Sequence, residues 1–202
     1  MYGLTPAETR LLRRLSTPAR DQRYLDSLAY NTEKGGETYR SPRRVIRDRT
    51  AHCAEGAFLA AAAFRLQGRR PLLLDLESVR DDDHVLAVYR DGGAWGAVAT
   101  SKFAGLRFRA PVYRTIRELA LSYFEDYYNW GGERTLRGYS RPLSLARFDR
   151  IGWMTTEAEL WPIVEHLAAA PHTPLITPAM ARRLPRLDRR SYDSGVLGAP
   201  GR

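Results

Sequence analysis

The stretch "HCAEGAFLAAAAFRLQG", residues 52–68, predicts a helix inside the core of the protein. Every residue from Ala57 to Phe64 is apolar, so a helix built from them has no polar face to turn toward water. Gly68 follows the last apolar turn, where glycine commonly ends a helix. The only cysteine of the chain, Cys53, stands at the start of this stretch. We therefore take a helix over residues 53–66 as the centre of the fold.

Three β-strands are predicted directly after this helix. The segments "RPLLLDLES" (70–78) and "HVLAVYR" (84–90) have the apolar composition of buried strands. The segment "DGG" (91–93) is a turn, and "AWGAVAT" (94–100) returns as the second strand of a hairpin. Strands in one run with helices around them indicate an α+β fold. We expect a buried helix with Cys53 at its N-terminus, packed on a small antiparallel sheet, with flanking helices.

Flanking helices are predicted on both sides of this unit. The segment "TPAE" (5–8) has a capping box with proline at the first helical position, and a second helix is predicted over 19–30. Apolar and aromatic residues at helical spacing predict a longer helix over 113–129. Thr156 and Glu159 form another capping box, which predicts the start of a last helix.

The length of the chain favours one domain. A chain of 202 residues suffices for one domain with a real core. We expect a single domain over 1–180, with a loop-rich passage at 131–150. Residues 181–202 are rich in Arg, Pro, Gly and Ser without apolar periodicity, so we expect a flexible tail there. No apolar run is long enough to cross a bilayer and no leader pattern is visible, so we expect a cytoplasmic protein without membrane contact.

The chain carries a formal net charge of +9, and arginine supplies almost all of its positive charge. A basic protein is a candidate for a nucleic-acid partner. Here the arginines are scattered among acidic residues and lack the basic and aromatic pattern of an RNA-binding sheet. A preference for arginine and alanine is also what a GC-rich genome produces. A nucleic-acid partner is therefore the less favoured interpretation.

Disulfide, metal and cofactor chemistry find little support in the sequence. One cysteine excludes an internal disulfide and any zinc site built on several cysteines. The run Asp81–Asp83 supplies carboxylates, but three consecutive side chains rarely point the same way, so a solvated turn is favoured over a metal site. No glycine-rich nucleotide loop is present. We predict neither a metal nor a cofactor.

Cys53 has the placement of a nucleophile. A helix N-terminus carries partial positive charge and unpaired N–H groups, which lower the pKa of a thiol and can hold an oxyanion. Ala54 is the expected oxyanion donor of the first turn. Glu55 is expected to cap that turn, with a substrate contact as the alternative role. The competing interpretation is that Cys53 is a small, buried apolar residue.

A thiolate nucleophile needs a base within hydrogen-bond reach, and His84 is the best candidate. His84 opens a strand, where it can meet the start of a helix packed on the same sheet. His52 adjoins Cys53, but neighbouring residues on a helix do not face each other. A third residue would orient the imidazole of His84. The paired strand offers no acid, so we expect Ser101, or Asp83 from the acidic run, to fill this role.

The order of these features resembles the transglutaminase-like superfamily of papain-related cysteine enzymes. A cysteine at the start of a buried helix, a strand, a histidine on the next strand and a hairpin to a tryptophan-bearing strand carry the resemblance. The resemblance implies an α+β core and thioester chemistry at amides, by transamidation, deamidation or peptide cleavage. It implies Cys53 as nucleophile and His84 as base, with Trp95 matching the family's tryptophan. Where the family has an aspartate after this tryptophan, the chain has Ala99.

The stretch "DDDHVLAVYR…WGAVATSKFAGLRFR" (81–109) also resembles bacterial proteins that carry this domain without an assigned chemistry. We expect substrate contacts from four residues of the region: His52, Trp95, Lys102 and Arg107. The basic residues of 100–109 favour an acidic or carboxylate-bearing substrate, because arginine and lysine form strong hydrogen bonds with carboxylates.

The favoured function is cysteine-dependent amide acyl transfer or hydrolysis through a thioester on Cys53. A peptide, a protein or a small amide is the expected substrate. One alternative is a catalytically inactive module that binds a peptide or a carrier protein, which Ala99 suggests. Another is a nucleic-acid-associated basic protein, which the net charge suggests. The sequence leaves the oligomeric state open, as well as the choice between hydrolysis and transfer.

Overall fold

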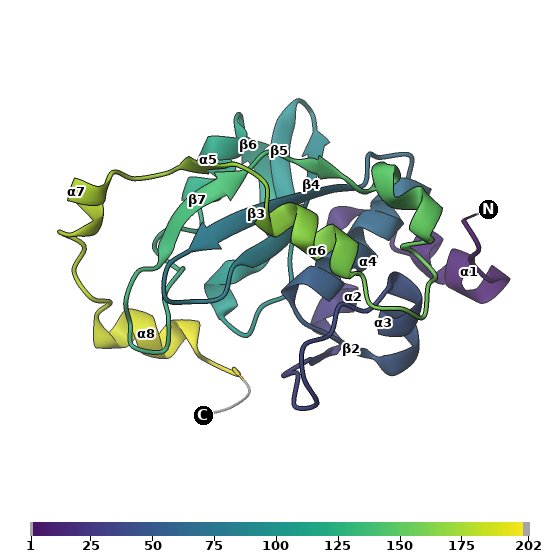
Figure 1. The fold of residues 1–202 in the computed structure, drawn as a ribbon, viewed down its shortest axis with the longest axis horizontal. Helices are drawn as coiled ribbons and strands as arrows, with labels where there is room; N and C mark the ends of the chain where they lie inside the picture. The colour runs from purple at the N-terminus through teal and green to yellow at the C-terminus, as the bar shows by residue number, and fades with distance from the viewer. Residues whose placement is uncertain (1, 200–202) are drawn as a thin grey trace.

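The computed structural model describes residues 2–199 and confirms the α+β fold (Figure 1). Within these residues, seven strands form one antiparallel sheet in the order β6–β5–β4–β3–β7–β9, and β8 pairs with β3. Two short strands, β1 and β2, form a separate parallel pair. The strands are β1 Ala29–Tyr30, β2 Thr50–Ala51, β3 Leu72–Ser78, β4 His84–Asp91, β5 Ala94–Val98, β6 Arg109–Tyr113, β7 Leu136–Ser140, β8 Leu143–Ser144 and β9 His172–Pro174.

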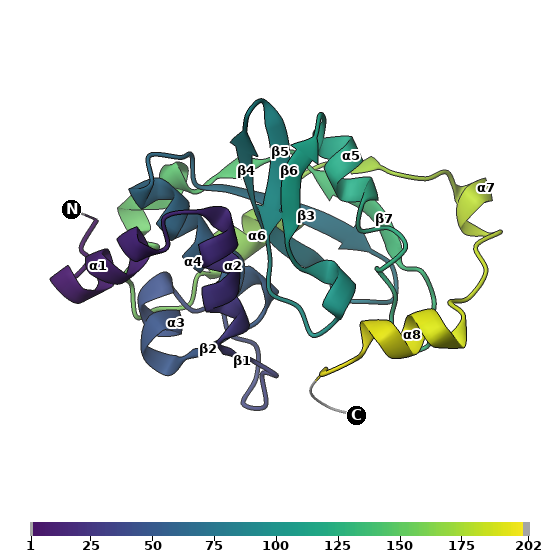
Figure 2. The same ribbon diagram turned by 180° about the vertical axis from the view of Figure 1, so that it is seen from behind.

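The central helix is α4, Cys53–Leu66, as the sequence predicts. Its side chains are buried from Ala54 to Phe64, and they pack against Val85 and Ala87 on one face of the sheet. Helix α5 supplies Leu119 to a second apolar cluster on the other face. Figures 1 and 2 show α1, α2 and α3 grouped around α4, with α7 and α8 at the opposite end of the molecule. The other helices are α1 Pro6–Arg14, α2 Pro18–Asp26, α3 Pro42–Asp48, α5 Ile116–Leu121, α6 Trp161–Ala168, α7 Pro178–Ala181 and α8 Arg189–Gly195.

The N-terminus of α4 and the first residue of β4 meet at one end of the sheet. In the register of β3 and β4, Leu76 lies opposite His84 and Asp75 lies opposite Val85. Helix α4 packs along β4, and the Sγ atom of Cys53 lies 3.9 Å from the backbone oxygen of Asp83, the residue before β4. The predicted meeting of these two elements is therefore present in the fold.

The start of α4 is fixed by an unusual capping box. The N-cap residue is His52, whose Nδ1 atom accepts a hydrogen bond from the N–H of Ala54 at 3.3 Å. In return, the carboxylate of Glu55 accepts the N–H of His52 at 3.1 Å. Gly56 lets the helix approach the loop after β5, because a Cβ atom there would lie 2.3 Å from the Thr100 hydroxyl. These contacts set where the helix begins and how closely it packs.

The helix predicted over 113–129 is much shorter in the structure. Residues Arg109–Tyr113 form the edge strand β6, in which Tyr113 pairs with Trp95 of β5. Thr115 then caps α5 by accepting the N–H of Glu118 at 3.1 Å, and the helix ends at Leu121. The apolar spacing is present, but the first residue of the predicted helix, Tyr113, pairs in β6, and the residues after Leu121 form consecutive turns.

Two further predictions about the second half of the chain differ from the structure. The passage 131–150 contains strands β7 and β8, which pair with β3 across the sheet. The last long helix, α6, begins at Trp161 without a side-chain cap, so the capping box predicted at Thr156 and Glu159 is absent from the structure. The Glu159 carboxylate instead accepts a hydrogen bond from Arg44 of α3 at 2.6 Å, a contact across 115 residues of chain.

The C-terminal segment, expected as a flexible tail, folds onto the sheet through residue 199. Helix α8 is capped by Asp188, and the ring of Tyr192 lies 5.7 Å from that of Tyr128. Val196 is buried in the second apolar cluster. The N–H of Leu187 also donates to the oxygen of Gly132, and Arg134 donates to the oxygen of Pro185, so several contacts anchor the segment. The end of the expected tail, 200–202, lies outside the described residues.

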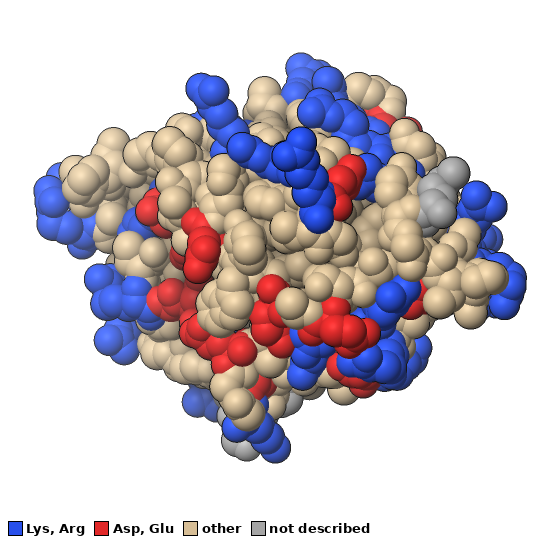
Figure 3. Space-filling model, turned by 45° about the vertical axis from the view of Figure 1, so that its right-hand side comes forward, with Lys and Arg blue, Asp and Glu red and all other residues tan. Residues whose placement is uncertain are grey.

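Charge is distributed unevenly over the surface. Figure 3 shows acidic side chains gathered in a band across one face, with basic side chains on either side of it. Among residues 2–199, no helix combines the length and the apolar character that crossing a bilayer demands.

Candidate active site

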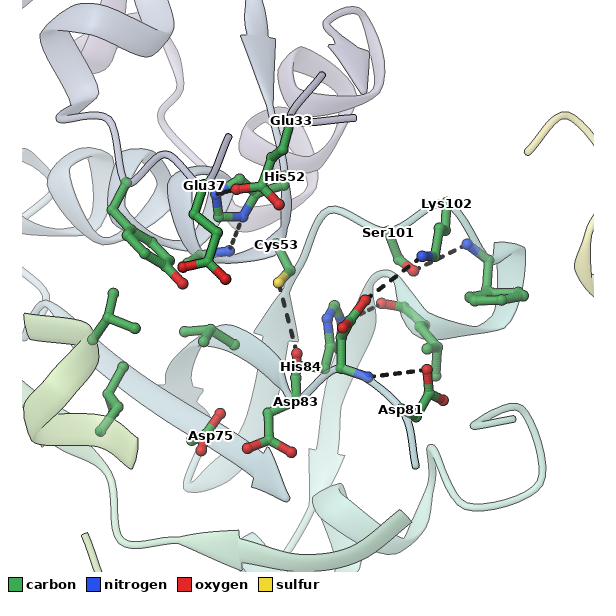
Figure 4. A pocket seen from close by; sticks show the side chains of 18 of the residues that line it. Glu33, Glu37, His52, Cys53, Asp75, Asp81, Asp83, His84, Ser101 and Lys102 are labelled. Carbon is green, nitrogen blue, oxygen red and sulfur yellow. Dashed lines mark hydrogen bonds and ion pairs between the residues drawn. The ribbon is translucent and has the colours of Figure 1, made fainter. Parts of the chain in front are cut away.

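A cleft of about 350 Å³ opens at the end of the sheet where α4 and β4 begin. Cys53 and His52 reach it from the start of α4, and His84 reaches it from the start of β4. The loop after β5 contributes Ser101 and Lys102 on a further side. Figure 4 shows the sulfur of Cys53 between the side chains of these elements. The structure therefore brings together residues that lie up to 50 positions apart in the chain.

The thiol of Cys53 lies between two imidazoles. Burial by itself raises the pKa of the thiol, but hydrogen bonds with His52 and His84 and the positive charges of the two rings outweigh burial and bring the pKa well below its usual value. The position of Cys53 at the first residue of α4 adds the partial positive charge of the helix N-terminus. The geometry thus favours a thiolate at neutral pH.

The ring of His84 is held by a backbone carbonyl. His84 is buried, and its Nε2 N–H donates to the oxygen of Leu106 at 2.8 Å. The rings of Tyr123 and Tyr127 contact it edge-on, with centroid distances of 6.4 and 6.3 Å. Because Nε2 is used by Leu106, the nitrogen that faces the thiol is Nδ1. This is the tautomer that a base for Cys53 needs.

This arrangement corrects the expected orienting residue. The hydroxyl of Ser101 accepts the N–H of Phe103 at 3.0 Å, and the carboxylate of Asp83 accepts the N–H of Ser78 at 2.7 Å. Both side chains are used to shape their own loops, and the group bonded to His84 is the carbonyl of Leu106. Leu106 ends a short 3-10 helix, Ala104–Leu106. A main-chain acceptor has no signature in the amino-acid sequence, so residue types alone could not reveal it.

His52 is more closely involved with the thiol than its neighbouring position suggested. Its Nε2 atom donates to the backbone oxygen of Thr38 at 2.5 Å, while Nδ1 accepts the N–H of Ala54. Burial lowers the pKa of His52, but hydrogen bonding to Cys53, the charges of Cys53 and Glu55 and the carbonyl of Thr38 raise it to about 9 overall. The Nδ1 atom cannot accept from Ala54 and donate to the thiol at once. His52 therefore caps the helix when neutral and pairs with the thiolate when charged.

The two first-turn residues have separate roles. The carboxylate of Glu55 is fully buried and accepts hydrogen bonds from Asn31 and Thr38, at 3.1 and 2.9 Å, and from the backbone N–H of Arg40. It ties the loop 31–40 to the start of α4, which is the capping role favoured from the sequence. The N–H of Ala54, the expected oxyanion donor, is engaged by His52 in this structure.

The expected substrate contacts divide into two groups. His52 and Lys102 line the cleft. Trp95 lies outside it on β5, with the guanidinium of Arg90 5.3 Å from its ring. Arg107 also lies outside, where it forms an ion pair with Asp26 of α2. Strand pairing and a partner 81 residues away therefore remove two of the four expected contacts from the cleft.

Several cleft residues were missed because their neighbours are distant in sequence. Glu33 and Glu37, from the loop before α3, line the wall beside His52. Asp75 of β3 is buried and accepts a hydrogen bond from the Nε2 atom of His172, 97 residues away, at 2.9 Å. Burial and the charge of Asp83 raise the pKa of Asp75, against the effect of His172. The sequence of β3 is mostly apolar around Asp75. No residue near Asp75 in the sequence indicates that its partner is His172.

No group of three or more His, Cys, Asp or Glu side chains within residues 2–199 is arranged to hold a metal ion. The carboxylates of Asp81 and Asp83 serve the turn itself, since Asp81 accepts from the Thr135 hydroxyl at 2.7 Å. The thiol of Cys53 and the imidazoles of His52 and His84 are the cleft side chains whose interactions lower the pKa of the thiol.

Comparison of the sequence with models of known protein families gives no match, and comparison with curated proteins gives none either.

Proposed function

We propose that this protein catalyses acyl transfer from, or hydrolysis of, an amide through a thioester on Cys53. The observation that carries the proposal is the thiol of Cys53 at the N-terminus of α4, inside a cleft and flanked by His52 and His84, which lower its pKa. A cysteine that merely fills the core has no need of two imidazoles. The resemblance to transglutaminase-like enzymes supports the same chemistry.

The first half of the reaction forms the thioester. Nδ1 of His84 takes the thiol proton, and the sulfur attacks the carbonyl carbon of the amide. As the carbon–sulfur bond forms, the carbonyl electrons move to the oxygen, which accepts from the N–H of Cys53 and, once His52 releases it, from the N–H of Ala54. The intermediate collapses by breaking the carbon–nitrogen bond. The leaving amine takes the proton from His84.

The second half returns the enzyme to its starting state. Water or an amine attacks the thioester carbonyl, and Nδ1 of His84 takes a proton from it. The carbon–sulfur bond then breaks and the thiolate of Cys53 is restored. Throughout, the Leu106 carbonyl accepts the Nε2 N–H of His84, a bond that strengthens when the ring is charged. This carbonyl does the orienting work for which the family uses aspartate, so Ala99 does not by itself argue for an inactive module.

The protonation state of His52 decides whether the N–H of Ala54 is available to an oxyanion. While neutral, its Nδ1 atom engages the N–H of Ala54. When its ring is protonated opposite the thiolate, Nδ1 becomes a donor and releases that N–H toward the cleft. A protonated His52 thus stabilises the thiolate of Cys53 and leaves the N–H of Ala54 free for the oxyanion, while His84 takes the thiol proton.

The test is the rate of Cys53 alkylation by iodoacetamide as a function of pH, in the wild type and in His84→Ala. We expect an apparent thiol pKa below that of a free cysteine in the wild type and a higher one in the variant. A screen of amides and thioesters then follows, with Cys53→Ala as the control. A thiol in the folded wild type that alkylates no faster than a free cysteine at neutral pH, with a rate that ignores His84, would contradict the proposal.

A further inference from the structure

The cleft around Cys53 has the opposite charge from the protein as a whole. The chain carries a net charge of +9. Six carboxylates nevertheless line the cleft, and Lys102 is the one lysine or arginine among the described residues that line it. The six are Glu33, Glu37, Asp75, Asp81, Asp82 and Asp83. No arginine of the described residues lines this cleft.

The acids stand on two sides of the thiol. Figure 4 shows Glu33 and Glu37 beside His52 on one wall, and Asp81 and Asp83 below Cys53 on the other. A substrate carbonyl that reaches the sulfur therefore brings its neighbouring groups between two acidic walls. Figure 3 shows acidic side chains gathered in a band across one face of the molecule.

The single ammonium group does little to offset this charge. The Nζ atom of Lys102 lies 3.7 Å from the carboxylate of Asp82. It also lies 5.5 Å from the ring centre of Trp130 and 5.8 Å from that of Phe103. Lys102 is thus held by an acid and two rings at the edge of the cleft. It neutralises Asp82. On the opposite wall the imidazole of His52 faces Glu33 at 3.6 Å, and Glu37 has no ion-pair partner among the described residues.

The effect of these charges extends across the cleft. Burial raises the pKa of Tyr39 to about 12, and the charges of Glu37, Glu33, Cys53 and Asp82 raise it in the same direction. The pKa of Tyr39 is therefore raised by acidic side chains of both walls. Low-dielectric walls lined by one sign of charge concentrate ligands of the opposite sign.

We propose that the acyl substrate of this cleft is cationic, with a lysine-like or arginine-like group beside the carbonyl that Cys53 attacks. This inference rests on the proposed function of the thiol and names its substrate class. It replaces the acidic substrate expected from the sequence, because Arg107 is paired with Asp26 outside the cleft and Arg109 is bound to Ser122 and Asp126. Glu33 and Glu37 are the specificity-determining residues on the wall opposite Lys102. The Glu33 carboxylate lies 3.6 Å from Nε2 of His52, and within residues 2–199 Glu37 has no ion-pair partner.

The sharpest test uses three thiol reagents of matched chemistry and different charge. These are the trimethylammonioethyl, methyl and sulfonatoethyl methanethiosulfonates. In each reaction the thiolate attacks the sulfenyl sulfur, methanesulfinate leaves with the bonding electrons, and a mixed disulfide forms on Cys53. The rate of each reagent with Cys53 is divided by the rate of the same reagent with 2-mercaptoethanol. This division removes the intrinsic differences in reactivity between the reagents. The corrected cation-to-anion rate ratio then measures the charge preference of the cleft alone.

We expect a corrected ratio of about 10- to 100-fold at low salt, falling toward unity in about 1 M salt as the charges are screened. Glu33→Gln and Glu37→Gln should each lower the ratio, and the double variant should lower it further. The matched control is Asp91→Asn, which removes an acid at the opposite end of β4 and should leave the ratio unchanged. A ratio near one in the wild type would overturn the charge proposal, as would a ratio that both glutamine variants leave intact.

The outcomes separate this proposal from the function on which it rests. A folded protein whose thiol reacts with none of the three reagents, the neutral one included, contradicts the proposed function. Fast reaction at equal corrected rates leaves the thiol function standing and refutes the charge preference alone. Thioesters of N-acetyl-lysine, N-acetyl-norleucine and N-acetyl-glutamate extend the test to acyl groups. The expected order of kcat/KM is lysine, then norleucine, then glutamate, and the reverse order would overturn the proposal.

Discussion

His84 donates its Nε2 N–H to the backbone carbonyl of Leu106, 2.8 Å away, so the imidazole beside Cys53 is oriented without an acidic side chain. A carbonyl fixes the tautomer as an acid would, but it carries no full charge to stabilise the imidazolium. It is also insensitive to pH, because it does not titrate. The geometry of the dyad should therefore persist into acidic solutions where a carboxylate would be protonated.

Ser101→Ala should leave the thiol as reactive as in the wild type, because the Ser101 hydroxyl accepts from Phe103 rather than contacting His84. We expect the alkylation rate at neutral pH to change less than about twofold, against a rise in apparent thiol pKa of about one unit or more in His84→Ala. Alkylation rates measured over a range of pH values give both the rate at neutral pH and the apparent pKa of the thiol. A Ser101→Ala profile that matches the His84→Ala profile would restore Ser101 as the orienting residue.

Substitution of His52 separates its two roles. Asparagine is a good N-cap, whereas alanine is a poor one, so His52→Ala should lose about 1 kcal/mol more stability than His52→Asn. Both variants remove the imidazole, and both should raise the apparent pKa of Cys53. Urea unfolding and the alkylation profile give the two quantities. If His52→Ala and His52→Asn had equal stabilities but different apparent pKa values of Cys53, the capping role and the charge effect assigned to His52 would both be wrong.

Asp21 makes stability depend on pH. Its side chain is fully buried, one oxygen accepts from Gln67 at 3.2 Å, and the other, Oδ1, has no partner among the described residues. Burial raises its pKa to about 8, although Gln67 and Arg69 act to lower it. The folded state therefore keeps a proton that the unfolded chain releases from about pH 4 upward.

This difference in pKa between the folded and unfolded states determines how the free energy of unfolding changes with pH. The Asp21 contribution is fully present below the unfolded pKa, is lost as pH rises toward about 8, and is constant above that value. The loss is on the order of a few kcal/mol. Asp21→Asn cannot ionise, so its stability should fall less than that of the wild type between pH 5 and pH 8. Thermal unfolding at matched pH values tests this, and parallel curves for the two proteins would refute it.

Gly56 marks the closest approach of α4 to the loop after β5. A Cβ atom at this position would lie 2.3 Å from Oγ1 and 2.9 Å from Cβ of Thr100, so one of the two elements must move. Gly56→Ala should cost about 1–3 kcal/mol despite the better helix propensity of alanine. Gly35→Ala is the control, because no atom lies within 4 Å of its added Cβ. Denaturant midpoints that rank the two variants in the other order would contradict the packing.

The sequence predicts the centre of this fold well because the signals there are local. An apolar run bounded by Gly68 specifies α4, and the "DGG" turn specifies the hairpin of β4 and β5. The edge strands escape prediction because their pairing is not local. Strand β9 has three residues and exists only through pairing with β7, more than 30 positions earlier.

The candidate site divides in the same way. Cys53 and His84 can be predicted from the sequence, because local patterns place the cysteine at the start of a helix and the histidine at the start of a strand. The charge of the cleft cannot be predicted in this way, because it depends on which arginines form ion pairs outside the cleft. Arg107 stands five positions from Lys102 in the chain, yet it is paired with Asp26 and leaves the cleft acidic. Composition gives the sign of the whole protein and says nothing of the sign of one cavity.

The C-terminal helix α8 bears on how the protein should be cut for expression. The Tyr192 hydroxyl donates to the backbone oxygen of Trp130, the residue whose ring lies beside Lys102. Leu197 lines a second pocket together with Ser101 and Lys102. A fragment trimmed at residue 180 would keep Cys53 and His84 but lose the buttress behind one wall of their cleft. The reactivity of Cys53 measured on such a fragment would therefore differ from its reactivity in the full chain.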